Sequence, residues 1–147
     1  RPNAVALPVL VSGVAQADLI GDLSDGAHAL ARSLWPGGLT LVVDRRSGVD
    51  MDLGGRADRI GLRCPAHPVP LELCRQAGPL AATSANRHGE ADLASASEVA
   101  ETFPGLLVLD GGECRGVSST VVDATGEAPQ LIRAGAVPWE EVLAAWG

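Results

Sequence analysis

Residues 24–43 read SDGAHALARSLWPGGLTLVV, and this stretch predicts a helix that leads directly into a buried strand. Ser24 has the side chain of a helix N-cap. Apolar residues then recur at the three- and four-residue spacing of one helix face, namely Ala27, Leu30, Ala31 and Leu34. The run Pro36-Gly37-Gly38 ends the helix, and the apolar run 39–43 predicts a buried strand.

Further helices and strands are predicted on both sides of this stretch. Strands are expected at residues 9–11, 59–63, 80–83, 106–109, 120–122 and 130–132. Helices are expected to begin at Pro68, at the capping box Ser95/Glu98 and at Pro138, and to end at Gly78, Phe103 and Trp146. Strands and helices interleave without strict βαβ regularity. We therefore expect one α+β domain over residues 1–147, with a twisted mixed sheet and helices on both faces.

The charge of the chain narrows the classes of function. All eleven basic residues are arginine, and the net charge is −7. Without lysine, neither the phosphate-binding lysine of a P-loop nor a Schiff base can come from this chain. The negative charge also argues against a general nucleic-acid binder, which normally has a basic surface. Arginine remains well suited to bind phosphate and carboxylate groups through paired hydrogen bonds.

The cysteines, the histidines and the hydropathy of the chain argue against disulfide-rich, metal-binding and membrane-spanning proteins. Cys64, Cys74 and Cys114 are odd in number and contain no CxxC pair, so we expect reduced thiols and neither a disulfide framework nor a zinc site. The three histidines form no metal-binding cluster, and we identify no metal-ligating side chain. No apolar run approaches the roughly 20 residues that span a membrane. We expect a cytoplasmic protein.

Polar residues that follow predicted strands are the candidate site. Arg63 ends a strand before a Pro-Ala-His-Pro turn, Ser84 and Asn86 follow the strand at 80–83, and Ser118-Ser119 precedes the strand at 120–122. Ligand sites of layered α/β proteins collect at such strand ends. Each place also has a simpler explanation, namely a surface ion pair, a loop capped by its own side chains or a turn. The residues alone predict an α/β domain with a candidate anion site.

Five segments resemble the motifs of the YrdC-like family, in its order and spacing. The family segments are WPGPLT, R-x-P-x-H-P, S-x-N, STVVD and ILRPGAI. Their counterparts here are WPGGLT at 35–40, RCPAHP at 63–68, SAN at 84–86, STVVD at 119–123 and LIRAGA at 131–136. The resemblance implies a YrdC-like fold with a concave ligand cleft. It also implies an enzyme that joins L-threonine, bicarbonate and ATP into threonylcarbamoyl-adenylate, for the modification of a tRNA adenosine.

The resemblance also implies roles for six residues. Three would bind L-threonine, with the first pairing its carboxylate: Arg63, Ser84 and Ser119. Three would bind ATP: Arg1, Asn86 and Arg133. Catalysis would rest on positioning and on the charges of Arg1, Arg63 and Arg133, with Mg²⁺ accompanying ATP. The tRNA or a downstream transferase complex would be the partner.

The chain also departs from the family pattern. Arg1-Pro2 resembles the end of a K-x-R-P motif, so we expect the family's N-terminal segment to be missing. Four positions differ from the usual family residue, namely Ser12 for His, Arg59 for Thr, Thr83 for Pro and Ala134 for Pro. Three alternatives remain open: an RNA-binding or ribosome-associated module, a paralogue without threonine chemistry, and the carbamoyl-adenylate module of a larger carbamoyltransferase.

Overall fold

A computed structural model describes residues 7–83, 89–112 and 116–147. By its internal contacts the chain divides into two compact units. The larger unit consists of Arg1–Ala82 and Val117–Gly147, and the smaller unit is Thr83–Gly116. Among the described residues, no helix has the length and hydrophobicity that crossing a bilayer requires.

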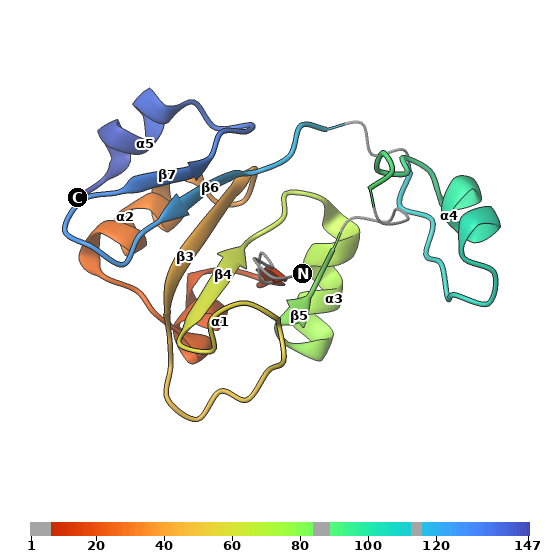
Figure 1. Ribbon diagram of the computed structural model, residues 1–147, viewed down its shortest axis with the longest axis horizontal. Helices are drawn as coiled ribbons and strands as arrows, with labels where there is room; N and C mark the ends of the chain where they lie inside the picture. The colour runs from red at the N-terminus through yellow and green to blue at the C-terminus, as the bar shows by residue number, and fades with distance from the viewer. Residues whose placement is uncertain (1–6, 84–88, 113–115) are drawn as a thin grey trace. The chain divides into compact units, whose positions relative to one another are not determined.

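Figure 1 shows the elements of the described chain. The strands are β1 (Val9–Leu10), β2 (Gly21–Asp22), β3 (Leu39–Arg45), β4 (Arg59–Arg63), β5 (Leu80–Ala81), β6 (Thr120–Asp123) and β7 (Gln130–Arg133). The helices are α1 (Val14–Ile20), α2 (Asp25–Leu34), α3 (Pro68–Ala77), α4 (Ala96–Thr102) and α5 (Trp139–Ala145). Of these, α4 alone belongs to the smaller unit.

The strands form one mixed sheet in the order β5-β1-β4-β3-β6-β7, with β2 paired to β3. β1 and β4 run parallel, as do β3 and β6, whereas β3 and β4 run antiparallel. The expected mixed sheet is therefore confirmed. Its register sets one row of residues side by side: Thr40 of β3 lies opposite Arg63 of β4 and Val121 of β6, and Val121 lies opposite Arg133 of β7.

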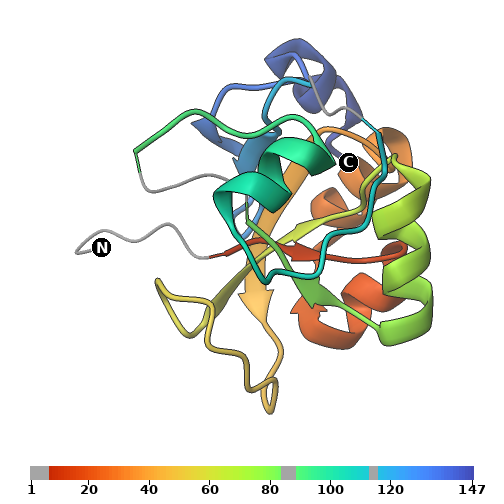
Figure 2. The same cartoon turned by 90° about the vertical axis from the view of Figure 1, so that its right-hand side faces the viewer.

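The two faces of this sheet differ because side chains alternate along each strand. One face carries the core, formed on the central strands by Leu39, Leu41, Val43, Ile60, Leu62 and Val122. Helix α2 packs Ala27, Leu30 and Ala31 into this core, and α1, α3 and α5 add further apolar side chains to it. Helices were expected on both faces. In the larger unit, α1, α2, α3 and α5 instead pack on the core face (Figure 2), which leaves the opposite face for a cavity.

Local signals explain most element boundaries. The hydroxyl of Ser24 accepts a hydrogen bond from the N–H of Ala27 at 3.2 Å, as expected of an N-cap. Pro68 begins α3, and Gly78 follows it with a positive φ of 90°. Ser95 caps α4 by accepting from the N–H of Glu98, which confirms the predicted helix start.

The sequence analysis also differs from the structure at single elements. The strand predicted at 106–109 is irregular chain in which Leu106, Leu107 and Leu109 are 57%, 86% and 58% exposed. A strand needs a neighbour to satisfy its backbone, and these residues pair with no strand among the described residues. Helix α1 was missed because it has only seven residues and its N-cap, Gly13, has no capping side chain.

Candidate functional site

A cavity of about 320 Å³ lies on the sheet face opposite the core. Its floor includes Val42, Gly61 and Val121, which stand on three adjacent strands. Its polar lining is Thr40, Arg56, Arg59, Ser119, Asp123 and Arg133. We call Thr40, Ser119 and Arg133, together with the adjacent Arg63, the inner end, and Arg56, Arg59 and Asp123 the outer end. The volume is within the usual range for a small-molecule site.

A hydrogen-bonded network fixes the inner end. The hydroxyls of Thr40 and Ser119 lie 2.7 Å apart, and both residues are only 5% exposed. Arg133 donates from Nε and Nη2 to the carbonyl oxygen of Ser119, at 3.2 and 2.8 Å, and from Nη2 to its hydroxyl at 3.1 Å. These bonds hold the Arg133 guanidinium against Ser119. Its Nη1 group donates to no described residue.

A close backbone contact makes this network possible. A Cβ atom on Gly135 would lie 2.3 Å from the carbonyl oxygen of Ser118 and 2.5 Å from that of Ser119. The N–H of Ala136 donates to the Ser118 carbonyl at 2.9 Å. Only glycine allows this approach, so Gly135 brings the segment that follows Arg133 directly against Ser118 and Ser119.

Arg63 belongs to the inner end, where it lies opposite Thr40 in the sheet, but it does not line the cavity itself. Its Nε donates to the carbonyl of Gly37 at 3.1 Å, and its other nitrogens donate to no described residue. Burial lowers the pKa of Arg63, and the neighbouring charge of Arg133 lowers it further. Arginine nevertheless stays charged near neutral pH. Among the described residues, neither Arg63 nor Arg133 forms an ion pair, so the inner end favours an anion.

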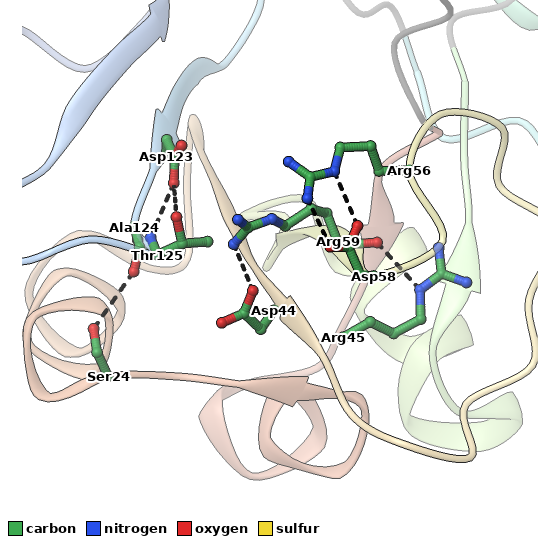
Figure 3. Close-up of polar contacts among 9 residues, drawn as sticks. All are labelled: Ser24, Asp44, Arg45, Arg56, Asp58, Arg59, Asp123, Ala124 and Thr125. Atoms are coloured by element: carbon green, nitrogen blue, oxygen red, sulfur yellow. Dashed lines mark hydrogen bonds and ion pairs between the residues drawn. The ribbon is translucent and has the colours of Figure 1, made fainter.

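The outer end has paired charges (Figure 3). Arg56 donates to both carboxylate oxygens of Asp58, at 3.0 and 2.7 Å. Arg59 donates to Asp44 Oδ1 at 2.5 Å. Both arginines therefore already have a carboxylate partner, in contrast to the two at the inner end.

Asp123 is the third carboxylate of the outer end. Its Oδ1 accepts from the N–H of Thr125 at 2.9 Å and from the Thr125 hydroxyl at 2.6 Å. Burial acts to raise the pKa of Asp123, but the hydrogen bonds from Thr125 and the charges of Arg59 and Arg56 outweigh it, so the pKa lies below its ordinary value. Asp123 is thus a carboxylate at neutral pH.

The site residues expected from the sequence fall into two groups. Ser119 and Arg133 line the cavity, and Arg63 lies beside it within the electrostatic reach of Arg133. Arg1, Ser84 and Asn86 lie outside the described residues. The ligand roles of all six remain predictions.

Sequence reasoning assigned no site role to four lining residues: Thr40, Arg56, Arg59 and Asp123. For two of them the sequence did offer an indication, because they belong to segments that resemble family motifs: Thr40 ends WPGGLT and Asp123 ends STVVD. Strand alternation could also have indicated Arg59. It is four residues from Arg63 on the same strand, so the two side chains face the same side of the sheet. Arg56 precedes β4 in a loop, and the sequence suggested for it only a place in an arginine stripe for RNA binding.

The described residues contain no group of three or more His, Cys, Asp or Glu that could hold a metal ion. Cys64 and Cys74 are buried and not disulfide-bonded, and burial raises the pKa of both thiols.

Comparison with known proteins identifies the family. Residues 1–135 match the family model Sua5/YciO/YrdC, described as "Telomere recombination". The chain is 38% identical over 147 residues to the threonylcarbamoyl-AMP synthase of Pyrococcus abyssi, covering 97% of this chain and 43% of that protein. It is 33% identical over 153 residues to the enzyme of the same name from Bacillus subtilis, covering 100% of this chain and 44% of that protein.

A solved structure is also similar to the whole chain. The Pyrococcus abyssi Sua5 protein complexed with L-threonine superposes with a TM-score of 0.88 at 37% identity, covering 99% of this chain and 45% of that one. The chain thus spans less than half the length of these relatives. The motif resemblance and these matches agree, and the chain belongs to the Sua5/YciO/YrdC family.

Proposed function

We propose that the chain is the catalytic body of an L-threonylcarbamoyladenylate synthase, which joins L-threonine, bicarbonate and ATP and releases pyrophosphate. The observation that carries the proposal is the pair Arg63 and Arg133, which has no carboxylate partner among the described residues. Such a pair attracts carboxylate or phosphate groups. The family narrows the choice, because a Pyrococcus abyssi relative has this enzyme name and the Sua5 structure was solved with L-threonine.

The reaction consists of two bond-forming steps. The threonine ammonium group loses one proton, and its nitrogen then forms an N–C bond with the carbon of bicarbonate, while one C–O bond of bicarbonate breaks and water leaves. A carbamate oxygen then attacks the α-phosphorus of ATP, and the bond from this phosphorus to the bridging oxygen breaks and releases pyrophosphate. Neither step needs a nucleophilic side chain. Both need in-line positioning and positive charge near the phosphate oxygens.

The proposed roles follow from this requirement. Arg63, with Ser84 and Ser119, would bind threonine, and the four guanidinium N–H groups of Arg63 that bond to no described residue suit its carboxylate. Arg133, with Arg1 and Asn86, would bind the nucleotide. The Arg133 Nη1 group suits a phosphate oxygen, because the other side of the fork already holds Ser119. ATP would enter as its Mg²⁺ complex, which is a substrate here.

The product would serve the threonylcarbamoyl modification of a tRNA adenosine, in the cytoplasm, where ATP, threonine and tRNA occur together. Binding of double-stranded RNA is a weaker proposal. Outside the inner end, Arg56 and Arg59 are each paired with an aspartate, which cancels positive charge that RNA phosphates would need. Only steep salt dependence of RNA binding would favour it.

ATP–pyrophosphate exchange with the full-length protein tests the proposed function. Labelled pyrophosphate should enter ATP only when threonine and bicarbonate are both present. Arg63→Ala should abolish this exchange. Arg75→Ala is the matched control, because Arg75 is an exposed arginine on α3 that pairs with Glu72. Exchange that is absent, or that is independent of threonine, would contradict the proposal.

A further inference from the structure

The hydroxyl groups of Thr40 and Ser119 form a pair at the inner end of the cavity. Their oxygens lie 2.7 Å apart, both residues are 5% exposed, and both line the cavity. The pair contains two hydroxyl protons, and the hydrogen bond between the two oxygens uses one of them. Neither hydroxyl donates to any other described residue. One hydroxyl proton is therefore left over in a nearly buried place, where a donor needs an acceptor.

The neighbours of the pair indicate which hydroxyl keeps this proton. Arg133 donates from Nη2 to the Ser119 hydroxyl oxygen at 3.1 Å, whereas the Thr40 hydroxyl contacts no described polar group except that of Ser119. If Thr40 donated to Ser119, the Ser119 oxygen would accept two hydrogen bonds and the Thr40 oxygen none. If Ser119 donates to Thr40, each oxygen accepts one, and the positive guanidinium polarises the hydroxyls toward Thr40. The second order satisfies both oxygens and leaves the remaining proton on Thr40.

The packing of Thr40 fixes the direction of its side chain. Its Cγ2 methyl group lies toward Gly61 of β4, where a Cβ atom on that glycine would meet it at 3.5 Å. Its hydroxyl lies toward Ser119, directly before β6, the other neighbour of β3. A β-branched side chain has few rotamers, and here both branches have a contact. The Thr40 hydroxyl is therefore preorganised, and a ligand that accepts its hydrogen bond orders little that was mobile.

We propose that Thr40 is a substrate-binding residue, whose hydroxyl donates a hydrogen bond to an anionic oxygen of a substrate in the cavity. That oxygen belongs to the carboxylate of threonine or to a phosphate of ATP, because the same donor suits both. The inference rests on the proposed function and deepens it, since it adds a neutral donor to a site whose assigned charges are arginines. The hydrogen bonds from Arg133 through Ser119 to Thr40 polarise this donor without a further cation.

Thr40→Val and Thr40→Ser in the full-length protein test this role. Valine keeps the shape of the side chain and the methyl group beside Gly61 but has no hydroxyl, whereas serine keeps the hydroxyl. Calorimetric titration with L-threonine alone and with Mg²⁺-ATP alone separates the two sources of the oxygen. We expect Thr40→Val to weaken the binding of at least one substrate about 10- to 150-fold, the range of a hydrogen bond to a charged group. Thr40→Ser should stay within about threefold of the wild type.

Thr120→Val is the matched control. Thr120 is also a buried threonine, 1% exposed, but its hydroxyl bonds to the backbone of Val137 and does not line the cavity. Its loss should lower the urea midpoint, because two backbone groups of Val137 lose their partner, and should leave both substrate affinities within about threefold. Equal weakening of substrate binding by the two valine variants would trace the loss to the fold and overturn the role of Thr40.

The outcomes separate the inference from the proposed function. If the wild-type protein binds neither threonine nor ATP, the proposed function fails. If it binds both, and Thr40→Val weakens each less than about tenfold or no more than Thr40→Ser does, the inference alone fails. A structure of the unmodified protein with the affected substrate gives a second test that needs no variant. Thr40 Oγ1 should lie within about 3.0 Å of a carboxylate or phosphate oxygen, and contact through the Ser119 hydroxyl alone would overturn the role.

Discussion

The inner and outer ends of the cavity use the same residue type in opposite electrical states. At the inner end, Arg133 donates to the carbonyl and hydroxyl of Ser119, and Arg63 donates to the carbonyl of Gly37. At the outer end, Arg56 and Arg59 donate to carboxylates. A neutral acceptor positions a guanidinium without cancelling its charge, whereas a carboxylate cancels it. The number of arginines around a cavity therefore does not measure its affinity for anions.

The largest effect is expected from the arginines themselves. Arg63→Ala should weaken threonine binding by about 2–5 kcal/mol, the cost of removing one partner of a partly buried charge pair. Arg59→Ala should change it by less than about 1 kcal/mol, because Asp44 already neutralises Arg59. Calorimetric titration of both variants with threonine measures the difference. If both variants lost the same amount of threonine affinity, the inner and outer ends would not differ in their attraction for anions.

The second largest effect is expected in ATP–pyrophosphate exchange when the forked guanidinium of Arg133 is replaced by the single ammonium group of lysine. Arg133→Lys should lower ATP–pyrophosphate exchange by at least about tenfold, since one charged hydrogen bond is worth about 1.5–3 kcal/mol. Arg133 holds Ser119 with one side of its fork and leaves Nη1 for a ligand, and lysine has no second branch for this task. Normal exchange in the lysine variant would show that a point charge is sufficient.

These expectations mark how far the sequence could predict the site. The motif order brought Arg63, Ser119 and Arg133 into one hypothesis, and the structure places them in one sheet region, with Arg63 on β4, Ser119 directly before β6 and Arg133 on β7. Which arginines have a carboxylate partner could not be predicted, because Arg59 meets Asp44 through the pairing of β3 with β4, and Arg56 meets Asp58 in the turn before β4. Alternation along β6 would have pointed to Asp123, whose face follows from that of Val121.

The fold was more predictable where a signal was local. Ser24, Pro68 and Gly78 set helix ends through their own backbone and side-chain chemistry, and these boundaries agree with the structure. The leucines at 106–109 had the composition of a strand, but pairing depends on a neighbour that composition cannot supply. The sequence analysis expected helices on both faces of the sheet and so did not predict which face would carry the cavity. The pattern of a helix does not reveal which face of a sheet the helix covers.

The third expected effect is on the free energy of unfolding, and it arises from the backbone contact that supports the inner end. Gly135→Ala should destabilise the protein by about 1–3 kcal/mol, because the new methyl group would lie 2.3 Å from a backbone oxygen that cannot move freely. Gly116→Ala is the control, since a Cβ there meets nothing within 4 Å. Urea unfolding measures both variants. An unchanged midpoint for Gly135→Ala would mean that the contact with Ser118 opens easily.

A fourth, smaller effect depends on pH. The folded-state pKa of Asp123 lies below the ordinary value of 3.8, so the folded state binds this proton less readily than the unfolded state. The resulting stability is present above about pH 4 and is lost as the pH falls through the folded-state pKa. Asp123→Asn should therefore lose less stability than the wild type between about pH 5 and pH 3. Parallel urea midpoints for the two proteins would contradict the lowered pKa.

The smallest effect is expected at the exposed ion pair of the outer end. Arg56 and Asp58 are 67% and 62% exposed in their side chains, so water and salt screen their attraction, and ordering two mobile side chains offsets the gain. Hydrogen bonding to Asp58 raises the pKa of Arg56, but a group that is already charged at neutral pH gains no charge from this shift. Arg56→Ala should leave the urea midpoint unchanged at both low and high salt, and should also leave threonine affinity unchanged. A loss of threonine affinity that disappears at high salt would show instead that Arg56 contributes long-range attraction at the cavity mouth, and the outer end would then not be electrically silent toward anions.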